Sequence, residues 1–363
     1  MSLAQPFTRY TEEGFPMGDK RGHSQDSSRN VNETGEEQRR GFPMAEDIRR
    51  ETIWCDSTDE ASRLHGYIWW PEEGVVPRAA VQLVHGMAEH IGRYDEFARY
   101  LNTKGFVVFG HDHIGHGESV ATHDDWGHLP AANGKDILVD DVHRVRTEAM
   151  ARITGAYGEI APLFLFGHSM GSFVVRSYLS RHAYGLSGAI ICGTGFMQPR
   201  TAAAGNAMAR FICKTRGERH HSKLLHNMGV GAYAKDIEDA ETDLDWLSHN
   251  KRNVARYQAD EACGFMFDAG GYATVTALMR EVCSPECVET YPKDLPLLYI
   301  AGTEDPVGEC GEGVSQAADL AHGAGVVDVR CRLYAGMRHE ILNERGRKVV
   351  YDDVVSWMEG YLK

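Results

Sequence analysis

The chain has 363 residues, of which 42% are hydrophobic and 25% charged, and its formal net charge is -14. This is the composition of a globular protein long enough for one large domain or two small ones. The negative charge argues against nucleic acid as a partner, and no run of 18 apolar residues predicts a membrane span.

The N-terminus and the cysteines predict a cytoplasmic protein. Residues Met1 to Tyr10 lack the apolar stretch of a secretory signal. The eight cysteines are scattered along the chain without a Cys-x-x-Cys pair, so we expect reduced thiols rather than a disulfide framework.

Residues 1–44 differ in composition from the rest of the chain. Only ten of these 44 residues are apolar, and they follow neither a helical nor a strand period. Such a segment cannot bury enough surface to offset the entropy lost on ordering. We therefore expect a disordered leader at 1–44 and a single α/β domain over residues 45–363.

From residue 48 onward, short β-prone runs alternate with amphipathic stretches. The first two runs predict a hairpin, and the later apolar runs separated by helices predict a mostly parallel sheet with helices on both faces. The strands are expected at 48–55, 63–70, 81–84, 106–109, 163–166, 189–192, 297–300 and 327–333, and the helices at 93–104, 134–153, 172–182 and 346–362.

The alternation stops between Thr194 and Asp294. This stretch is helical in pattern and rich in methionine and aromatic residues, which predicts a helical cap inserted at about 196–293. In open α/β sheets, ligands bind at the carboxyl ends of the strands, where such an insertion leaves the sheet. We expect Phe196, Met197 and Phe265 to contact substrate.

The sequence Gly167-His168-Ser169-Met170-Gly171 follows a predicted strand and opens a predicted helix. This is the setting of a nucleophile elbow, in which flanking glycines let the chain turn sharply and expose the serine. Ser169 is therefore the candidate nucleophile.

A serine nucleophile needs a base, an acid that orients the base, and donors for the oxyanion. Asp305 follows a late strand and His339 follows the last one, in the order expected after the serine. Glu304 is the alternative acid. The backbone N–H groups of Met87 and Met170 are the predicted oxyanion donors.

Residues His111 to Gly117 hold three histidines and an aspartate, which could ligate zinc. The stretch lies just past a predicted strand and contains two glycines, so a structural loop beside the site is the favoured interpretation. No metal or cofactor is predicted.

Residues 50–363 resemble an α/β-hydrolase of the monoacylglycerol lipase and lysophospholipase type, a group similar to some serine aminopeptidases. The resemblance rests on the serine elbow and on two stretches specific to this branch, His85-Gly86-Met87-Ala88-Glu89-His90 with Arg93-Tyr94, and His111-Asp112-His113-Ile114-Gly115-His116-Gly117-Glu118-Ser119. It implies the α/β-hydrolase fold, Ser169, Asp305 and His339 as a catalytic triad, and Met87 and Met170 as the oxyanion hole.

The chain departs from the pattern of this group in three places, one of them a pair of residues. His249-Asn250 stands where Arg-Asp is common, Glu261 where proline is common, and Ser172 where glycine is common. These departures leave the chemistry intact and put close equivalence of substrate in doubt.

The predicted function is a serine hydrolase of carboxylic esters, with a monoacylglycerol or a lysophospholipid as substrate. The alternatives are a small-ester esterase or a serine aminopeptidase on the same scaffold, and a catalytically silent binding protein. The predicted partner is a small lipid or ester, with transient membrane or micelle contact through the cap. The sequence specifies no oligomeric state.

Overall fold

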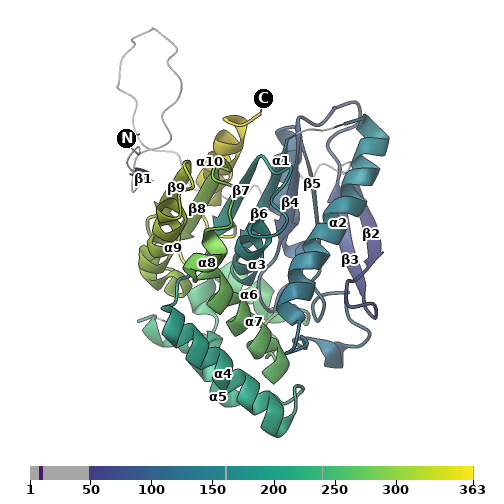
Figure 1. Cartoon of the computed structure of the whole chain (residues 1–363). Coiled ribbons are helices and arrows are strands. Elements are labelled where there is room, and N and C mark those ends of the chain that lie inside the picture. The colour runs from purple at the N-terminus through teal and green to yellow at the C-terminus, as the bar shows by residue number, and fades with distance from the viewer. Residues whose placement is uncertain (1–7, 11–48, 160–161, 239, 363) are drawn as a thin grey trace.

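The computed structural model describes residues 8–10, 49–159, 162–238 and 240–362 (Figure 1). Within them, nine strands form one sheet in the order β1-β9-β8-β7-β6-β4-β5-β3-β2. The strands are β1 Thr8–Tyr10, β2 Arg50–Asp56, β3 Arg63–Trp69, β4 Ala79–Val84, β5 Phe106–His111, β6 Leu163–His168, β7 Gly188–Cys192, β8 Leu297–Gly302 and β9 Val329–Tyr334.

The sheet is mostly parallel, as predicted. Only β3 is antiparallel to its neighbours, pairing with β2 as a hairpin and with β5. Every residue of β4, β5, β6, β7 and β8 is buried. Continuous apolar runs mark strands that are covered on both faces, which is why the sequence located these five strands.

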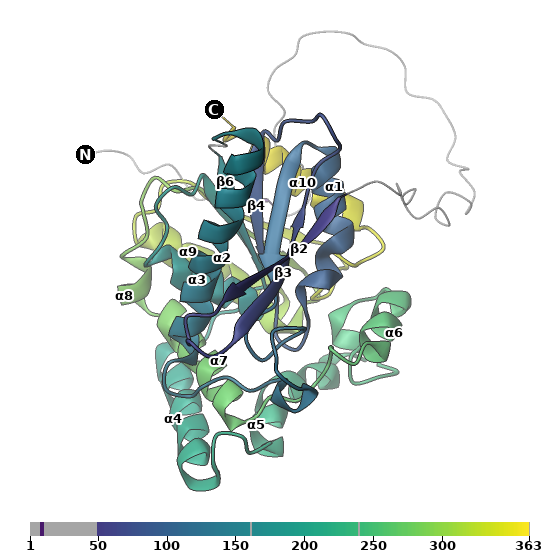
Figure 2. The ribbon, with the colours of Figure 1, turned by 90° about the vertical axis from the view of Figure 1, so that its right-hand side faces the viewer.

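Helices cover both faces of the sheet (Figure 2). On one face, α1 Asp95–Thr103 and α10 Arg347–Glu359 share a core with Phe97, Tyr351 and Trp357. On the other face lie α2 Gly134–Tyr157, α3 Met170–Leu179, α8 Pro285–Val288 and α9 Glu312–Gly323. This is the α/β-hydrolase architecture that the sequence predicted.

The chain between β7 and β8 contains helices α4 Pro199–Arg216, α5 Lys223–Met228, α6 Lys251–Ala259, α7 Ala269–Val282 and α8. Helices α4 and α5 lie beyond one end of the sheet (Figures 1 and 2). Helix α7 packs against α4 and also against α2 and α3, so it joins the predicted cap to the helical layer. The bounds 196–293 stay a prediction.

Short 3₁₀ helices complete the described fold, at Ile91–Tyr94, His123–Asp125, Val230–Asp236, Asp245–Leu247 and Pro306–Gly311. None of the helices in the described residues combines the length and the apolar composition that a bilayer span needs.

Of the predicted leader, only Thr8–Tyr10 belongs to the described residues. These residues form β1, which pairs in parallel with β9 at the edge of the sheet, Arg9 opposite Cys331. This strand departs from the disorder expected of the leader at these three residues. The rest of 1–44 lies outside the described residues, and its disorder stays a prediction.

Candidate active site

Ser169 occupies a sharp turn between β6 and α3, with a φ of 53°. A residue with a side chain rarely adopts this left-handed conformation, and its presence marks a strained turn. A Cβ atom at Gly167 would lie 2.4 Å from the carbonyl oxygen of Gly171, and one at Gly171 would lie 2.2 Å from that of Val84. Both glycines are therefore required, and Ser169 stays half-buried at the turn.

Asp305 and His339 form a buried pair behind the serine. His339 Nδ1 lies 3.0 Å from each carboxylate oxygen of Asp305, and Asp305 Oδ1 also accepts a hydrogen bond from the N–H of Val307 at 2.9 Å. Glu304, the alternative acid, pairs instead with His249 at 2.7 Å and is 49% exposed. The structure thus places Asp305, and not Glu304, against the histidine.

His339 and the serine elbow are neighbours. The ring of His168, the residue before Ser169, lies 4.7 Å from the ring of His339, centre to centre. The N–H of Ser169 donates to the carbonyl of Cys192, and a Cβ atom at the next residue, Gly193, would lie 3.2 Å from His339 Cε1. The carboxyl ends of β6, β8 and β9 therefore bring the three predicted triad residues to one place.

The loop after β4, which carries Met87, runs directly against the serine. A Cβ atom at Gly86 would lie 3.1 Å from Cβ of Ser169. The loop is held by Glu89, whose Oε1 accepts a hydrogen bond from the N–H of Gly86 at 2.6 Å. Met170 is the first residue of α3, where an N–H has no partner within the helix and is available to an oxyanion.

A buried chain of charges links this loop to His339. Arg93 contacts Glu89 at 2.5 Å and binds both carboxylate oxygens of Glu340 at 2.6 and 2.8 Å. Tyr94 donates to Glu89 at 2.8 Å, and Asn253 donates to Glu340 at 2.5 Å. Because Glu340 follows His339 directly, Arg93 connects the candidate base to the candidate oxyanion loop.

Comparisons with known proteins identify the family of the chain. The model of the serine aminopeptidase S33 family matches residues 76–346. The chain belongs to this family. The monoglyceride lipase homolog of Monkeypox virus is 40% identical over 297 residues, which are 79% of this chain and 91% of that protein. The monoacylglycerol lipase of Mycolicibacterium smegmatis is 27% identical over 301 residues, 81% and 92% of the two chains.

Among solved structures, a highly thermostable carboxyl esterase from Bacillus coagulans, determined in complex with glycerol, superposes with a TM-score of 0.79. It is 29% identical and covers 87% of this chain and 100% of its own. The predicted resemblance to the monoacylglycerol lipase type is confirmed.

In this S33 family member, residues of the cap close over His339. The Trp246 ring lies 5.1 Å from the imidazole, centre to centre. Leu247 accepts a hydrogen bond from the N–H of Glu340 at 2.8 Å, and Arg338 donates to the carbonyl of Asp245 at 2.7 Å. The sequence did not predict that Trp246 packs on the histidine, because no local pattern relates residues 93 positions apart.

The histidine-rich stretch from His111, the last residue of β5, to Gly117 packs as a structural loop. His111, His113 and His116 are buried, and burial lowers the pKa of each, that of His111 and His116 to about 3. Asp112 accepts hydrogen bonds from His65 Nδ1 and from the N–H of Ile91, both at 2.7 Å. Within the described residues, the one group of three potential metal ligands that lie close together contains none of these histidines.

The three predicted substrate residues are half-buried, and Phe196 and Phe265 border the same core. Phe265 stacks on Trp126 at 5.7 Å and on Phe267 at 6.0 Å, centre to centre. The loop that holds Phe196 and Met197 is fixed by the buried Arg176, which donates to the carbonyl of Gly195 at 2.9 Å. Substrate contact by these residues stays a prediction.

The buried carboxylates predict how stability depends on pH. Burial alone would raise the pKa of Glu89 and Glu340, but the Arg93 guanidinium, together with His168 at Glu89 and Asn253 at Glu340, outweighs it and holds both pKa values below the usual 4.5. The unfolded chain then binds protons more readily than the folded one. The contribution of these two carboxylates to the free energy of unfolding is therefore present above pH 4.5 and is lost as the pH falls through the lowered pKa values.

Glu340→Gln should therefore give a flatter dependence of unfolding free energy on pH in the acid range, measured by urea unfolding between about pH 6 and pH 3. Glu359→Gln, which removes the carboxylate of the exposed Arg78–Glu359 ion pair, should follow the wild-type curve. Equal slopes for wild type and Glu340→Gln would contradict the assignment.

Proposed function

We propose that this protein is a serine hydrolase that cleaves carboxylic esters, with monoacylglycerols as its main substrates and lysophospholipids as related ones. That it is a carboxylic ester hydrolase follows from its family and from relatives named as lipases and an esterase. The observation that supports the mechanism best is the buried Asp305–His339 pair beside a serine on a strained elbow.

The geometry supports an acyl-enzyme cycle. Ser169 Oγ attacks the acyl carbonyl while His339 accepts its proton, and the N–H groups of Met87 and Met170 bind the oxyanion. His339 then protonates the leaving alcohol, and Asp305 stabilises the imidazolium in its working orientation. Water attacks the acyl-enzyme, gives its proton to His339, and releases the fatty acid as Ser169 regains its hydrogen.

An ester substrate fits the charges better than an aminoacyl substrate does. An aminopeptidase needs a carboxylate available to the substrate's free amine. Glu89 and Glu340, the buried carboxylates beside His339 and the oxyanion loop, are already bound to Arg93. Asp305 is bound to His339, and Glu304 to His249.

A homologous series of esters tests the substrate class. Each buried methylene contributes at most about 0.8 kcal/mol, so kcat/KM should rise several-fold from acetyl to octanoyl esters. The measurement uses fixed salt and concentrations below the micellar range, with aminoacyl amides as the comparison. Phe265→Ala should reduce the octanoyl rate more than the acetyl rate. A steady decline of kcat/KM from acetyl onward would contradict the lipid substrates and indicate a small-ester esterase.

The cap also offers an apolar surface for aggregated lipid. Helices α4 and α5 expose four large apolar side chains, with Phe211 65% exposed; the other three are Met208, Leu224 and Met228. Both helices lie at the same end of the molecule (Figures 1 and 2), and exposed apolar side chains gathered in one patch are typical of an interaction surface. We propose that it contacts membranes or micelles transiently while substrate is taken up.

The variant Phe211→Ser/Leu224→Ser should bind phosphatidylcholine vesicles at least about tenfold more weakly, because each side chain contributes about 1.5–3 kcal/mol on burial. Its turnover of a soluble short ester should not change. Val327→Ser is the matched control, since Val327 is 72% exposed on the loop before β9. Equal vesicle binding by the double variant and this control would contradict the proposal.

A further inference from the structure

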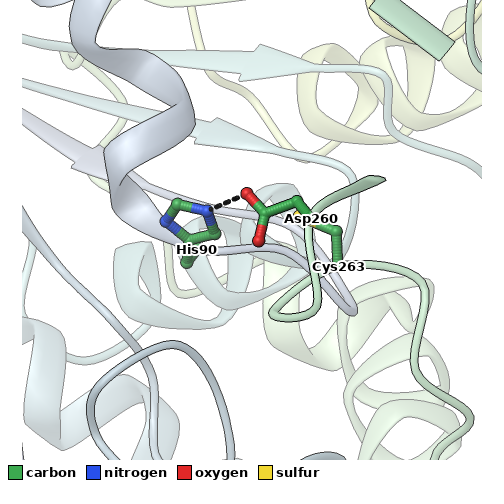
Figure 3. Close-up of side chains that lie close together, drawn as sticks. All are labelled: His90, Asp260 and Cys263. Atoms are coloured by element: carbon green, nitrogen blue, oxygen red, sulfur yellow. Dashed lines mark hydrogen bonds and ion pairs between the residues drawn. The ribbon is translucent and has the colours of Figure 1, made fainter. Parts of the chain in front are cut away.

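Three potential metal ligands meet where the cap touches the core (Figure 3). His90 lies in the loop after β4, and Asp260 and Cys263 lie in the turn after α6. His90 Nε2 is 3.0 Å from Asp260 Oδ2, and the ligand atoms of all three residues lie within 4.8 Å of one another. Cys263 is a buried thiol, whereas His90 and Asp260 are partly open to solvent.

An imidazole nitrogen, a carboxylate oxygen and a sulfur are the ligands that Zn²⁺ prefers. Zinc bonds of about 2.0–2.3 Å in tetrahedral geometry separate neighbouring ligand atoms by about 3.3–3.8 Å. The side chains therefore need to move by only about 1 Å. Three protein ligands leave the fourth position to water, and one thiolate with one carboxylate balances the charge of the ion.

We propose that His90, Asp260 and Cys263 form a binding site for a thiophilic divalent cation, with Zn²⁺ as the ion of best fit. On binding, the Cys263 S–H bond breaks, its proton leaves to solvent, and the sulfur lone pair forms the bond to zinc. His90 gives up the Nε2–H hydrogen bond to Asp260: the Nε2 proton leaves to solvent, Nδ1 carries the ring proton, and the Nε2 lone pair forms the bond to the ion, with no electron transferred.

The site joins two segments that the structure already holds together. Ala88, in the same loop as His90, accepts hydrogen bonds from the N–H of Gly264 at 2.9 Å and from the hydroxyl of Tyr257 at 2.8 Å. The ion would replace the His90–Asp260 hydrogen bond between these segments with a link that also includes Cys263. Because it binds the folded arrangement, zinc should raise the melting temperature.

Zinc binding is measured on the full chain by competition with a chromophoric chelator, and Co²⁺ is used as a spectroscopic probe. Wild type should bind one equivalent of zinc, with a thiolate-to-cobalt charge-transfer band and a higher melting temperature in zinc. Cys263→Ser and Asp260→Asn should each weaken binding at least about tenfold, and Cys263→Ser should abolish the band.

His182→Gln is the matched control. His182 and Asp140 are 3.0 Å apart, as are His90 and Asp260, and their exposures of 26% and 45% resemble the 24% and 39% of the proposed pair. This variant should bind zinc as wild type does, because its pair belongs to no group of three potential ligands in the described residues. Zinc binding that is absent in wild type, or equal in wild type, Cys263→Ser and Asp260→Asn, would overturn the proposal.

Discussion

Ser169→Ala is expected to lower kcat/KM for a monoacylglycerol by about 10⁴-fold or more and to abolish labelling by a fluorophosphonate probe. The substitution removes the only group that bonds to the acyl carbon in the proposed cycle. It keeps the elbow, since alanine adds no atoms to the strained turn. Ser180→Ala, at the other end of α3, should retain activity and labelling.

The partners of the serine should behave as one unit with it. His339→Ala should cause a loss of similar size, and combining it with Ser169→Ala should add little. Asp305→Asn should also be severely impaired, whereas Glu304→Gln should stay near wild type because Glu304 contacts His249 at the surface. Full activity in Ser169→Ala, or a Glu304→Gln defect equal to that of Asp305→Asn, would contradict these roles.

The parts of the fold and site that the sequence predicted are those with local causes. Buried parallel strands require continuous apolar runs, and the turn at Ser169 requires Gly167 and Gly171 within five residues. Asp305 and His339 were predicted because each follows a strand directly, and the sheet brings strand ends together. The Asp305–His339 contact spans 34 residues and follows from two adjacent parallel strands, β8 and β9.

The contacts that the sequence did not predict join segments that are far apart in the chain. Arg93 and Glu340 are 247 positions apart, and His90 and Asp260 are 170 apart, so no spacing rule relates them. The histidines around His113 show the converse case, because their closeness in sequence suggested a metal site. The tight turns of that loop direct them into the core, where they pack against one another.

Arg93→Met is expected to destabilise the protein by about 3–5 kcal/mol, because it leaves Glu89 and Glu340 buried without their cation. Methionine approximates the length of the arginine stem, so the effect reports the lost charge and hydrogen bonds more than a cavity. Unfolding in urea measures the change. Arg78→Met is the control, since its exposed ion pair with Glu359 should contribute no more than about 1 kcal/mol.

The same substitution should reduce turnover of soluble esters, because Arg93 connects the loop of Met87 to the segment that follows His339. We expect kcat to fall more than KM changes, since the contacts position catalytic groups and touch no substrate. Arg93→Met/Glu340→Gln should recover part of the lost stability by removing one unpaired carboxylate, but should not recover kcat, because the link stays broken. A stability change below about 1 kcal/mol in Arg93→Met would mean that water or rearranged neighbours stabilise the two carboxylates without the arginine. In that case the loops would be positioned by the cap contacts of Ala88 and Glu340 alone.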